Sequence, residues 1–252
     1  MTIATILRTG IDLSNHNGDI DFKKVKDSGI DFAILRTGYG KKYPDQYDTK
    51  FEDYYSQCKK YGIPVGAYHF SYALTEEAAV QEAEFMLEIV KGKQFEYPLY
   101  FDIETVPHTT LSKSICEEII TAFCGRLEKE GYFAGIYSFD TFFYSNIPEA
   151  TTKRYASWVA RVEDVKPTYA KNYGIWQYSW KGKIDGAKGS VDMNRCYIDY
   201  PSIIKKAQLN GYGDKFKFYD ITATCCKANQ EQTDKITNEC LKLGMTVTKK
   251  QI

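Results

Sequence analysis

The sequence has no excess charge of either sign and no long apolar run. Its 252 residues include 33 Lys and Arg against 33 Asp and Glu, which gives a formal net charge of zero. No chain-wide field therefore draws the protein to nucleic acid or to an anionic membrane, and we expect no nucleic-acid partner. Because no stretch approaches about 18 consecutive apolar residues, we also expect no membrane insertion.

The sequence also lacks a disulfide framework, a secretory signal and a metal-binding motif. Its seven cysteines are odd in number and scattered, which favours reduced thiols. The first residues have neither the basic start nor the apolar core of a signal peptide, so we expect synthesis in a reducing cytoplasm without ordinary export. No His or Cys spacing is typical of a zinc site, and no glycine-rich loop has the context of a phosphate site. We therefore expect no metal and no cofactor.

Aromatic and ordinary core-forming residues are abundant instead. The 43% hydrophobic and 26% charged content is typical of a globular protein. The 21 Tyr and 14 Phe can fill a core, or their faces can stack on the apolar faces of sugar rings. The chain is long enough for one α/β barrel, or for a catalytic domain of about 200 residues with a small appendage.

Short β-rich runs alternate with helical patterns over about the first 200 residues, which is typical of parallel strands joined by crossover helices. Eight such runs in succession predict a closed barrel; they lie at 10–13, 32–37, 64–70, 98–103, 133–138, 156–160, 174–178 and 191–193. Helices are predicted at 47–61, 75–90 and 114–129, the last with Ser114 and Glu117 as its capping box. No strong helical pattern lies between the sixth and eighth runs. The fold class expected is therefore α/β, an irregular TIM-like barrel with few helices in its second half.

The pattern changes near residue 209, where an Asn-Gly-Tyr-Gly-Asp segment predicts a turn or short linker. We expect a barrel over residues 1–208, a linker over 209–214 and a small C-terminal βαβ module over 215–252. A strand at 215–221, a helix at 227–243 and a strand at 245–248 make up this module. At roughly 40 residues it is near the size below which a domain seldom folds alone. We expect it to dock on the barrel or to pair with a second copy through its open strand edges, as a homo-oligomer.

Two acids at the end of the fourth predicted strand form the candidate chemical centre. Side chains two apart on a strand point the same way, so Tyr100, Asp102 and Glu104 share one face. The intervening apolar residues can face the helices, which turns the acids toward the barrel axis and its carboxyl-end mouth. Mutual repulsion and burial should raise at least one carboxyl pKa, as a general acid requires. Glycosidic cleavage needs such a donor and a group that stabilises the positive charge on the sugar.

Other residues decide whether this short motif has a function, because an isolated Asp-x-Glu is also typical of a cap or a surface ion pair. Asp12 and Asp192 end two further apolar runs, so a barrel would bring four acids to the same mouth. Arg36 ends another run and could hold one of these acids ionised. Its alternative is a salt bridge without a chemical role.

Seven motifs carry a resemblance to a known family. They are GIDLSNHNGDIDF at 10–22, FAILRTG at 32–38, GAYHF at 66–70, FDIE at 101–104, AGIYS at 134–138, GIWQY at 174–178 and VDMN at 191–194. In this order they resemble the glycoside hydrolase family 25 lysozymes, which occur as phage endolysins and as secreted bacterial and fungal muramidases. The resemblance covers about residues 8 to 200.

The resemblance implies hydrolysis of the β-1,4 bond between N-acetylmuramic acid and N-acetylglucosamine in bacterial peptidoglycan, on a barrel with fewer helices than strands. It implies that Glu104 is the general acid and Asp102 its acidic partner. Asp12 and Asp192 become the flanking acids of the site.

The resemblance also implies substrate-binding residues. Tyr68, Tyr137 and Trp176 match motif positions at the ends of three further strands, and with Arg36 they would bind the sugar. Ordinary barrel packing is the alternative for all three aromatic residues.

Two mechanisms stay open. The acetamido carbonyl of the substrate can attack the anomeric carbon while Asp102 orients the amide, a substrate-assisted exception to the two-carboxylate scheme. Alternatively, Asp12 or Asp102 acts directly as nucleophile or as base for water. We favour the substrate-assisted route.

The absence of a signal peptide favours the phage endolysin branch. We therefore expect the protein in the host bacterial cytoplasm until its release through a holin pore, and then at the cell wall. The C-terminal module would serve wall binding or self-association, or would only stabilise the barrel. Competing functions are another amino-sugar glycosidase, such as a chitinase, and a barrel that binds wall glycan without cutting it.

Overall fold

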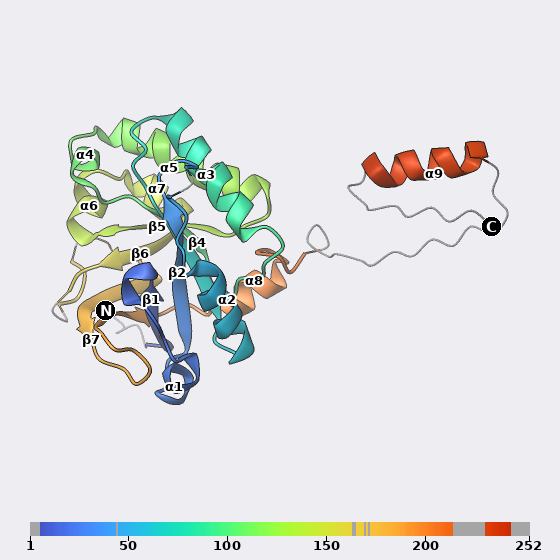
Figure 1. Cartoon of the computed structure of the whole chain (residues 1–252). Helices are drawn as coiled ribbons and strands as arrows, with labels where there is room; N and C mark the ends of the chain where they lie inside the picture. Colours follow the sequence, from blue (N-terminus) through green and yellow to red (C-terminus); the bar gives the residue numbers. More distant parts are fainter. Residues whose placement is uncertain are drawn as a thin grey trace. The chain divides into compact units, whose positions relative to one another are not determined.

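A closed barrel of eight strands forms the main body of the computed structural model (Figure 1). The structure describes residues 6–43, 45–162, 165–168, 170, 172–213 and 230–242. The chain divides into two compact units, Met1–Lys217 and Phe218–Ile252. In the first unit, strands adjacent in the sequence are adjacent in the sheet, and the last strand closes on the first. The predicted barrel is confirmed.

The strands are β1 (Arg8–Leu13), β2 (Phe32–Tyr39), β3 (Val65–Phe70), β4 (Leu99–Asp102), β5 (Ala134–Phe139), β6 (Ala156–Ala160), β7 (Ile175–Gly182) and β8 (Val191–Cys196). The helices are η1 (Asn15–Asn17), α1 (Phe22–Asp27), α2 (Phe51–Lys60), α3 (Glu76–Val90), α4 (Val106–Thr109), α5 (Lys113–Lys129), α6 (Asp140–Ser145), α7 (Glu149–Arg154), α8 (Tyr200–Lys206) and, in the second unit, α9 (Gln230–Lys242).

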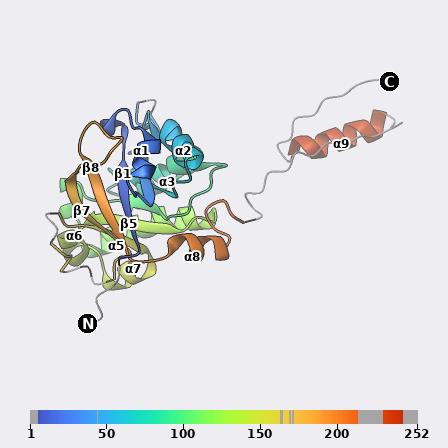
Figure 2. The same ribbon diagram turned by 90° about the horizontal axis from the view of Figure 1, so that it is seen from below.

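The direction of β8 differs from the expectation of parallel strands throughout. Strands β1 to β7 pair in parallel, whereas β8 pairs antiparallel with both β7 and β1. Figure 2 shows β8 beside these two strands. The segment between β7 and β8 is a hairpin connection, which antiparallel strands permit and parallel strands do not. Asp192 therefore lies near the start of β8, opposite Asp12 in the β1–β8 register.

Helical cover is uneven around the barrel, as predicted. The long helices α2, α3 and α5 belong to the first half. After β5 the helices shorten to α6 and α7, of six residues each. Among the described residues, no helix lies between β6 and β7 or between β7 and β8. The second half of the barrel therefore depends on loops for its outer packing.

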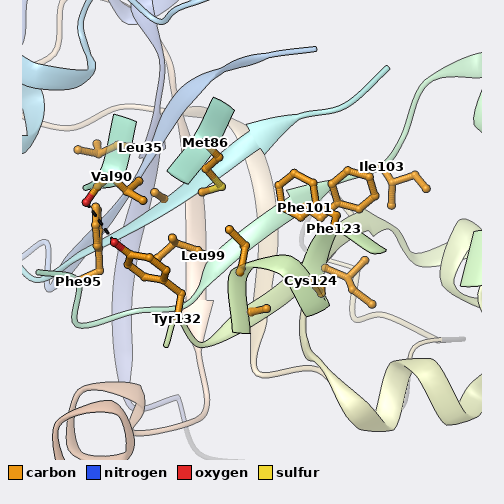
Figure 3. Close-up of a cluster of buried hydrophobic side chains, with 14 of the residues drawn as sticks. Leu35, Met86, Val90, Phe95, Leu99, Phe101, Ile103, Phe123, Cys124 and Tyr132 are labelled. Carbon is orange, nitrogen blue, oxygen red and sulfur yellow. Dashed lines mark hydrogen bonds between the residues drawn. The ribbon is translucent and has the colours of Figure 1, made fainter. Parts of the chain in front are cut away.

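The outer face of β4 packs against α5 (Figure 3). Leu99, Phe101 and Ile103 are fully buried in this layer. The rings of Phe101 and Phe123 stack with their centroids 4.2 Å apart. Since side chains alternate along a strand, this layer turns Asp102 toward the barrel interior.

The start of α5 is not capped as predicted. Ser112 precedes the helix, and its hydroxyl accepts a hydrogen bond from the backbone of Ile115 at 3.3 Å. The predicted capping box of Ser114 and Glu117 does not form, because Ser114 lies inside α5, and Glu117 accepts a hydrogen bond from Thr151 at 2.8 Å. The prediction placed the N-cap two residues too late, at Ser114 instead of Ser112.

Residues 209–212, assigned to a linker from the sequence, pack on the barrel. The Asn210 side chain is fully buried, donates to the Tyr97 carbonyl at 2.8 Å and accepts from the Phe133 amide at 2.6 Å. Gly211 has φ of +88°, and a Cβ there would lie 2.6 Å from the Lys93 carbonyl oxygen. The barrel body therefore extends through this turn.

In the second unit, helix α9 spans Gln230–Lys242 and corresponds to the helix predicted at 227–243. The strands predicted at 215–221 and 245–248 lie outside the described residues. Of the helices that are described, none is both long and apolar enough to cross a membrane.

We expect Phe123→Ala to lower the free energy of unfolding by about 3–5 kcal/mol, because it removes a ring buried between α5 and β4. Urea unfolding followed by circular dichroism measures this loss. The matched control is Ile115→Ala on the same helix, where the side chain is 38% exposed and the change should stay within about 0.5 kcal/mol. Equal losses in the two variants would contradict the packing described here.

Candidate active site

Four acids meet at one end of the barrel, as the sequence predicted. Asp12 lies near the end of β1, Asp102 ends β4, and Glu104 follows two residues later. Asp192 joins them from the antiparallel β8. Asp12 and Asp102 are buried, with 6% and 3% of their surface exposed. The charge of Asp12 acts on each of the other three acids, so the four form one electrostatic cluster.

Burial is the main cause of the raised pKa values of these groups. It raises the pKa of Glu104 to about 7; the charge of Asp12 adds to this, and a hydrogen bond with Tyr137 opposes it. Burial, followed by repulsion from Asp12 and Glu104, raises the pKa of Asp192 to about 8. The pKa of Asp102 rises well above its usual range through burial and repulsion from Glu104 and Asp12. Near neutral pH the cluster therefore holds protonated carboxyl groups, as general acid catalysis requires.

Asp12 has a lower pKa than Glu104 and Asp192. Burial raises its pKa to about 6, and hydrogen bonds from Asn194 and Gln177 limit the rise. Both amides donate to the same oxygen, Oδ2, at 2.7 Å from Asn194 and 3.0 Å from Gln177. One ionised acid beside protonated neighbours is an arrangement that enzymes use to separate acid and base roles.

Two carboxyl oxygens in the cluster are available to a ligand. Asp102 Oδ1 and Glu104 Oε2 are buried and have no hydrogen-bond partner among the described residues. Buried polar atoms are nearly always hydrogen-bonded, so unpaired ones at a site call for an explanation. A bound molecule that offers donors or acceptors to both oxygens would supply it.

The sequence assigned no role to Gln177 and Asn194, although both lie in the quoted motifs. Each is fully buried, or nearly so, and points into the barrel. Strand parity is the signal that could have found Asn194, because it lies two residues from Asp192 on one strand. The same alternation places Gln177 and its neighbour Trp176 on opposite faces of β7, so only one of the two can face the interior.

Trp176 does not line the mouth. Because Gln177 faces the interior, alternation turns Trp176 outward, where the Arg195 guanidinium lies 5.0 Å from its ring centroid. Its indole N–H donates to the Arg161 carbonyl at 2.7 Å, and only 1% of its surface is exposed. The exposed aromatic residue of this strand is Trp180, which the sequence analysis did not single out.

Tyr68 and Tyr137 do lie in the barrel interior with the acids. Both pack against Trp158, with ring centroids 5.8 Å and 4.4 Å away. Burial, together with the charges of the nearby acids, raises the pKa of both hydroxyls well above the usual range. They can therefore serve as neutral hydrogen-bonding groups beside the cluster.

The direct ion-pair partner of Arg36 is not one of the four acids. Its Nε lies 2.8 Å from Oδ2 of the buried Asp48, and a terminal nitrogen donates to Asn15 at 2.6 Å. At longer range its charge lowers the pKa of Asp102, against the stronger effects of burial and like charge. Asp48 and Asn15 are site residues that the sequence did not reveal.

Other features of the described residues do not compete with this site. No group of three or more His, Cys, Asp and Glu is arranged there to hold a metal ion. A cavity of about 490 Å³ lies near Lys113, Tyr144 and Asn172, but none of the four acids lines it.

Comparisons with known proteins agree with the motifs of the barrel. The family model described as "Glycosyl hydrolases family 25" matches residues 11–187. An autolytic lysozyme of Clostridium acetobutylicum is 28% identical over 187 residues, which cover 73% of this chain and 54% of that protein. This chain thus spans about half the length of that relative.

Solved structures share the fold. The modular autolysin LytC of Streptococcus pneumoniae matches with a TM-score of 0.65 and 26% identity, over 75% of this chain and 46% of LytC. A family 25 glycosyl hydrolase from Bacillus anthracis matches with a TM-score of 0.68 over 83% of this chain and 96% of its own, at 20% identity.

The raised pKa of Asp192 predicts a pH-dependent stability. A folded pKa of about 8, against 3.8 for a free side chain, means that the folded state favours the protonated form. The stabilisation that protonated Asp192 gives the folded state is fully present below about pH 4 and is lost as the pH rises through 8. The Asn side chain of Asp192→Asn cannot ionise. The free energy of unfolding of this variant, relative to wild type, should therefore increase by at least about 1 kcal/mol from pH 5 to pH 9, after discounting for partial exposure.

Urea unfolding at the two pH values measures this gain. The control is Asp27→Asn, whose carboxylate lies in solvent beside Lys23. A gain that is the same for both variants, or absent in Asp192→Asn, would contradict the assigned burial of Asp192.

Proposed function

The chain belongs to the glycosyl hydrolases family 25, and we propose that it is an N-acetylmuramidase of bacterial peptidoglycan. The bond cleaved would be the β-1,4 link between N-acetylmuramic acid and N-acetylglucosamine. The observation that supports this most is the buried acid cluster at the barrel mouth, with the pKa of Glu104 raised to about 7. A carboxyl group with this pKa can donate a proton to the leaving oxygen near neutral pH.

The state of Asp102 bears on the mechanism. Burial and the charges of Glu104 and Asp12 raise its pKa well above the usual range, which favours the protonated form, and a protonated carboxyl is a poor nucleophile. Direct attack by Asp102 is therefore disfavoured. We propose that the substrate's acetamido oxygen attacks the anomeric carbon, while Asp102 hydrogen bonds to that amide and Glu104 protonates the leaving group. Asp12 stays as the alternative direct nucleophile or base.

Peptidoglycan as the substrate has support from relatives. LytC has been solved in complex with a synthetic peptidoglycan ligand. A glycan would contact Tyr68 and Tyr137 in the interior, and the partly exposed Trp180 at the mouth offers a ring for stacking. We propose that the protein acts at the cell wall. A cytoplasmic stage before release, as in a phage endolysin, is part of the same proposal.

Digestion of purified peptidoglycan tests this function. Borohydride reduction followed by mass spectrometry identifies the new reducing ends, and muramic acid ends are expected. New glucosamine ends, activity on chitin alone, or binding without cleavage would each overturn the proposal.

We expect Glu104→Gln to keep its fold and to lose about 10²–10⁴-fold in the rate of wall hydrolysis, because the amide cannot donate the proton. In wild type the rate should fall as the pH rises through about 7, where Glu104 loses its proton. Release of reducing ends measures both effects. Glu77→Gln on the surface of α3 is the control and should act like wild type. A Glu104→Gln variant with wild-type turnover would end the acid assignment.

We propose that residues beyond the barrel form a small module for self-association or wall binding. The test compares the full chain with residues 1–213, a cut that keeps the buried turn at Asn210. Sedimentation should give a dimer for the full chain and a monomer for the shortened one, or the shortened chain should bind isolated walls less. Identical sedimentation and identical wall binding would leave the module with neither role.

A further inference from the structure

Two buried amides hold the Asp12 carboxylate in a fixed orientation. Asn194 and Gln177 both donate to Asp12 Oδ2, from β8 and β7 respectively. A primary amide can in principle present either its NH₂ or its oxygen to a neighbour. Which group faces Asp12 therefore depends on what binds the other end of each amide.

Aromatic donors determine this choice for both amides. The indole N–H of Trp158 donates to Asn194 Oδ1 at 2.7 Å. The indole N–H of Trp180 donates to Gln177 Oε1 at 2.8 Å, and the hydroxyl of Tyr137, whose one proton is shared between this oxygen and Glu104, lies 2.9 Å from it. An indole nitrogen is a donor only, so each amide oxygen must face its tryptophan. Each NH₂ group is then left to face Asp12.

We propose that Gln177 and Asn194 are positioning residues that keep Asp12 ionised and oriented while the neighbouring acids hold their protons. We call these two amides and their three aromatic donors, Trp158, Tyr137 and Trp180, the amide clamp. Donors that converge on one carboxylate oxygen stabilise its charged form without adding a cation. The catalytic role of the clamp rests on the proposed muramidase function.

Several titratable and charged groups surround Asp12 from the other strands. They are Arg36 on β2, Tyr68 on β3, Asp102 and Glu104 at the end of β4, Tyr137 on β5 and Asp192 on β8. The cation among them, Arg36, is engaged by Asp48. The hydrogen bonds that lower the pKa of Asp12 come from Asn194, Gln177 and the backbone.

The clamp also acts on the proton donor. The negative charge of Asp12 is one of the causes that raise the pKa of Glu104. A clamp that keeps Asp12 charged thus helps Glu104 to stay protonated near neutral pH. Neutral Asp12 would weaken both the charge stabilisation of the sugar and the proton supply.

Substitution at Asn194 distinguishes the clamp from simple packing. Asn194→Leu removes both the donor to Asp12 and the acceptor of Trp158. Leu is close to Asn in size, so the packing volume changes little. We expect the pKa of Asp12 to rise by about one unit in Asn194→Leu. A packing role alone would lower the stability of the variant and leave this pKa unchanged.

Carboxyl-carbon NMR of the full chain measures the titration of Asp12, with the signal assigned by its loss in Asp12→Asn. The acidic limb of the pH–rate profile on peptidoglycan should move upward with it. Gln177→Met should act in the same direction as Asn194→Leu. The control is Asn210→Leu, which removes a buried amide at the opposite end of the barrel and should lower stability without moving either readout.

Trp180→Phe gives a test that does not depend on core substitutions, because 44% of Trp180 is exposed. It removes one donor to Gln177 and leaves the ring, so the pKa of Asp12 should rise by about 0.3 units. The proposal is overturned if Asp12 titrates as in wild type in both Asn194→Leu and Gln177→Met. If those two variants do not fold, wild-type titration of Asp12 in Trp180→Phe overturns it. An equal rise in Asn210→Leu would also overturn it. Absence of wall hydrolysis by wild type would remove the proposed function and leave the NMR result to decide the clamp.

Discussion

The burial of four like-charged groups at one end of the barrel is the constraint on which the site depends. Carboxylates removed from water lose hydration, and together they repel, so the folded chain must neutralise most of them or compensate their charge. Raised pKa values favour the neutral, protonated forms of Asp102, Glu104 and Asp192, whereas hydrogen bonds from amides compensate the charge of Asp12. The chemistry proposed for the protein follows from how this one electrostatic problem is solved.

Strand parity explains why much of the fold and site was predictable. Alternation along β4 separates Phe101, which packs on α5, from Asp102, which faces the interior. That rule needs only the sequence, and closure of eight strands then brings the acids together. The direction of β8 needed more information, because three expected strand residues at 191–193 do not show how the chain arrives there. Only the paired length of β7 and β8 reveals the hairpin.

Hydrogen-bond partners were the least predictable part. Gln177 and Asn194 act through contacts with strands distant in the sequence. Arg36 pairs with Asp48, which was assigned to a helix from the sequence but lies in the loop before α2. The prediction that Trp176 binds the sugar chose the outer face of β7, since Trp176 and Gln177 point in opposite directions. Local sequence sets which way a side chain points, but not which partner meets it.

The antiparallel pairing of β1 with β8 has a consequence for how activity arises during synthesis. Asp12 and its donor Asn194 are 182 positions apart, and they meet only when the last strand closes the barrel on the first. Contacts between such distant segments form late, because the loop between them must be closed first. A chain still emerging from the ribosome therefore carries all its early motifs without an assembled acid cluster, and the proposed activity would begin only when the fold is complete.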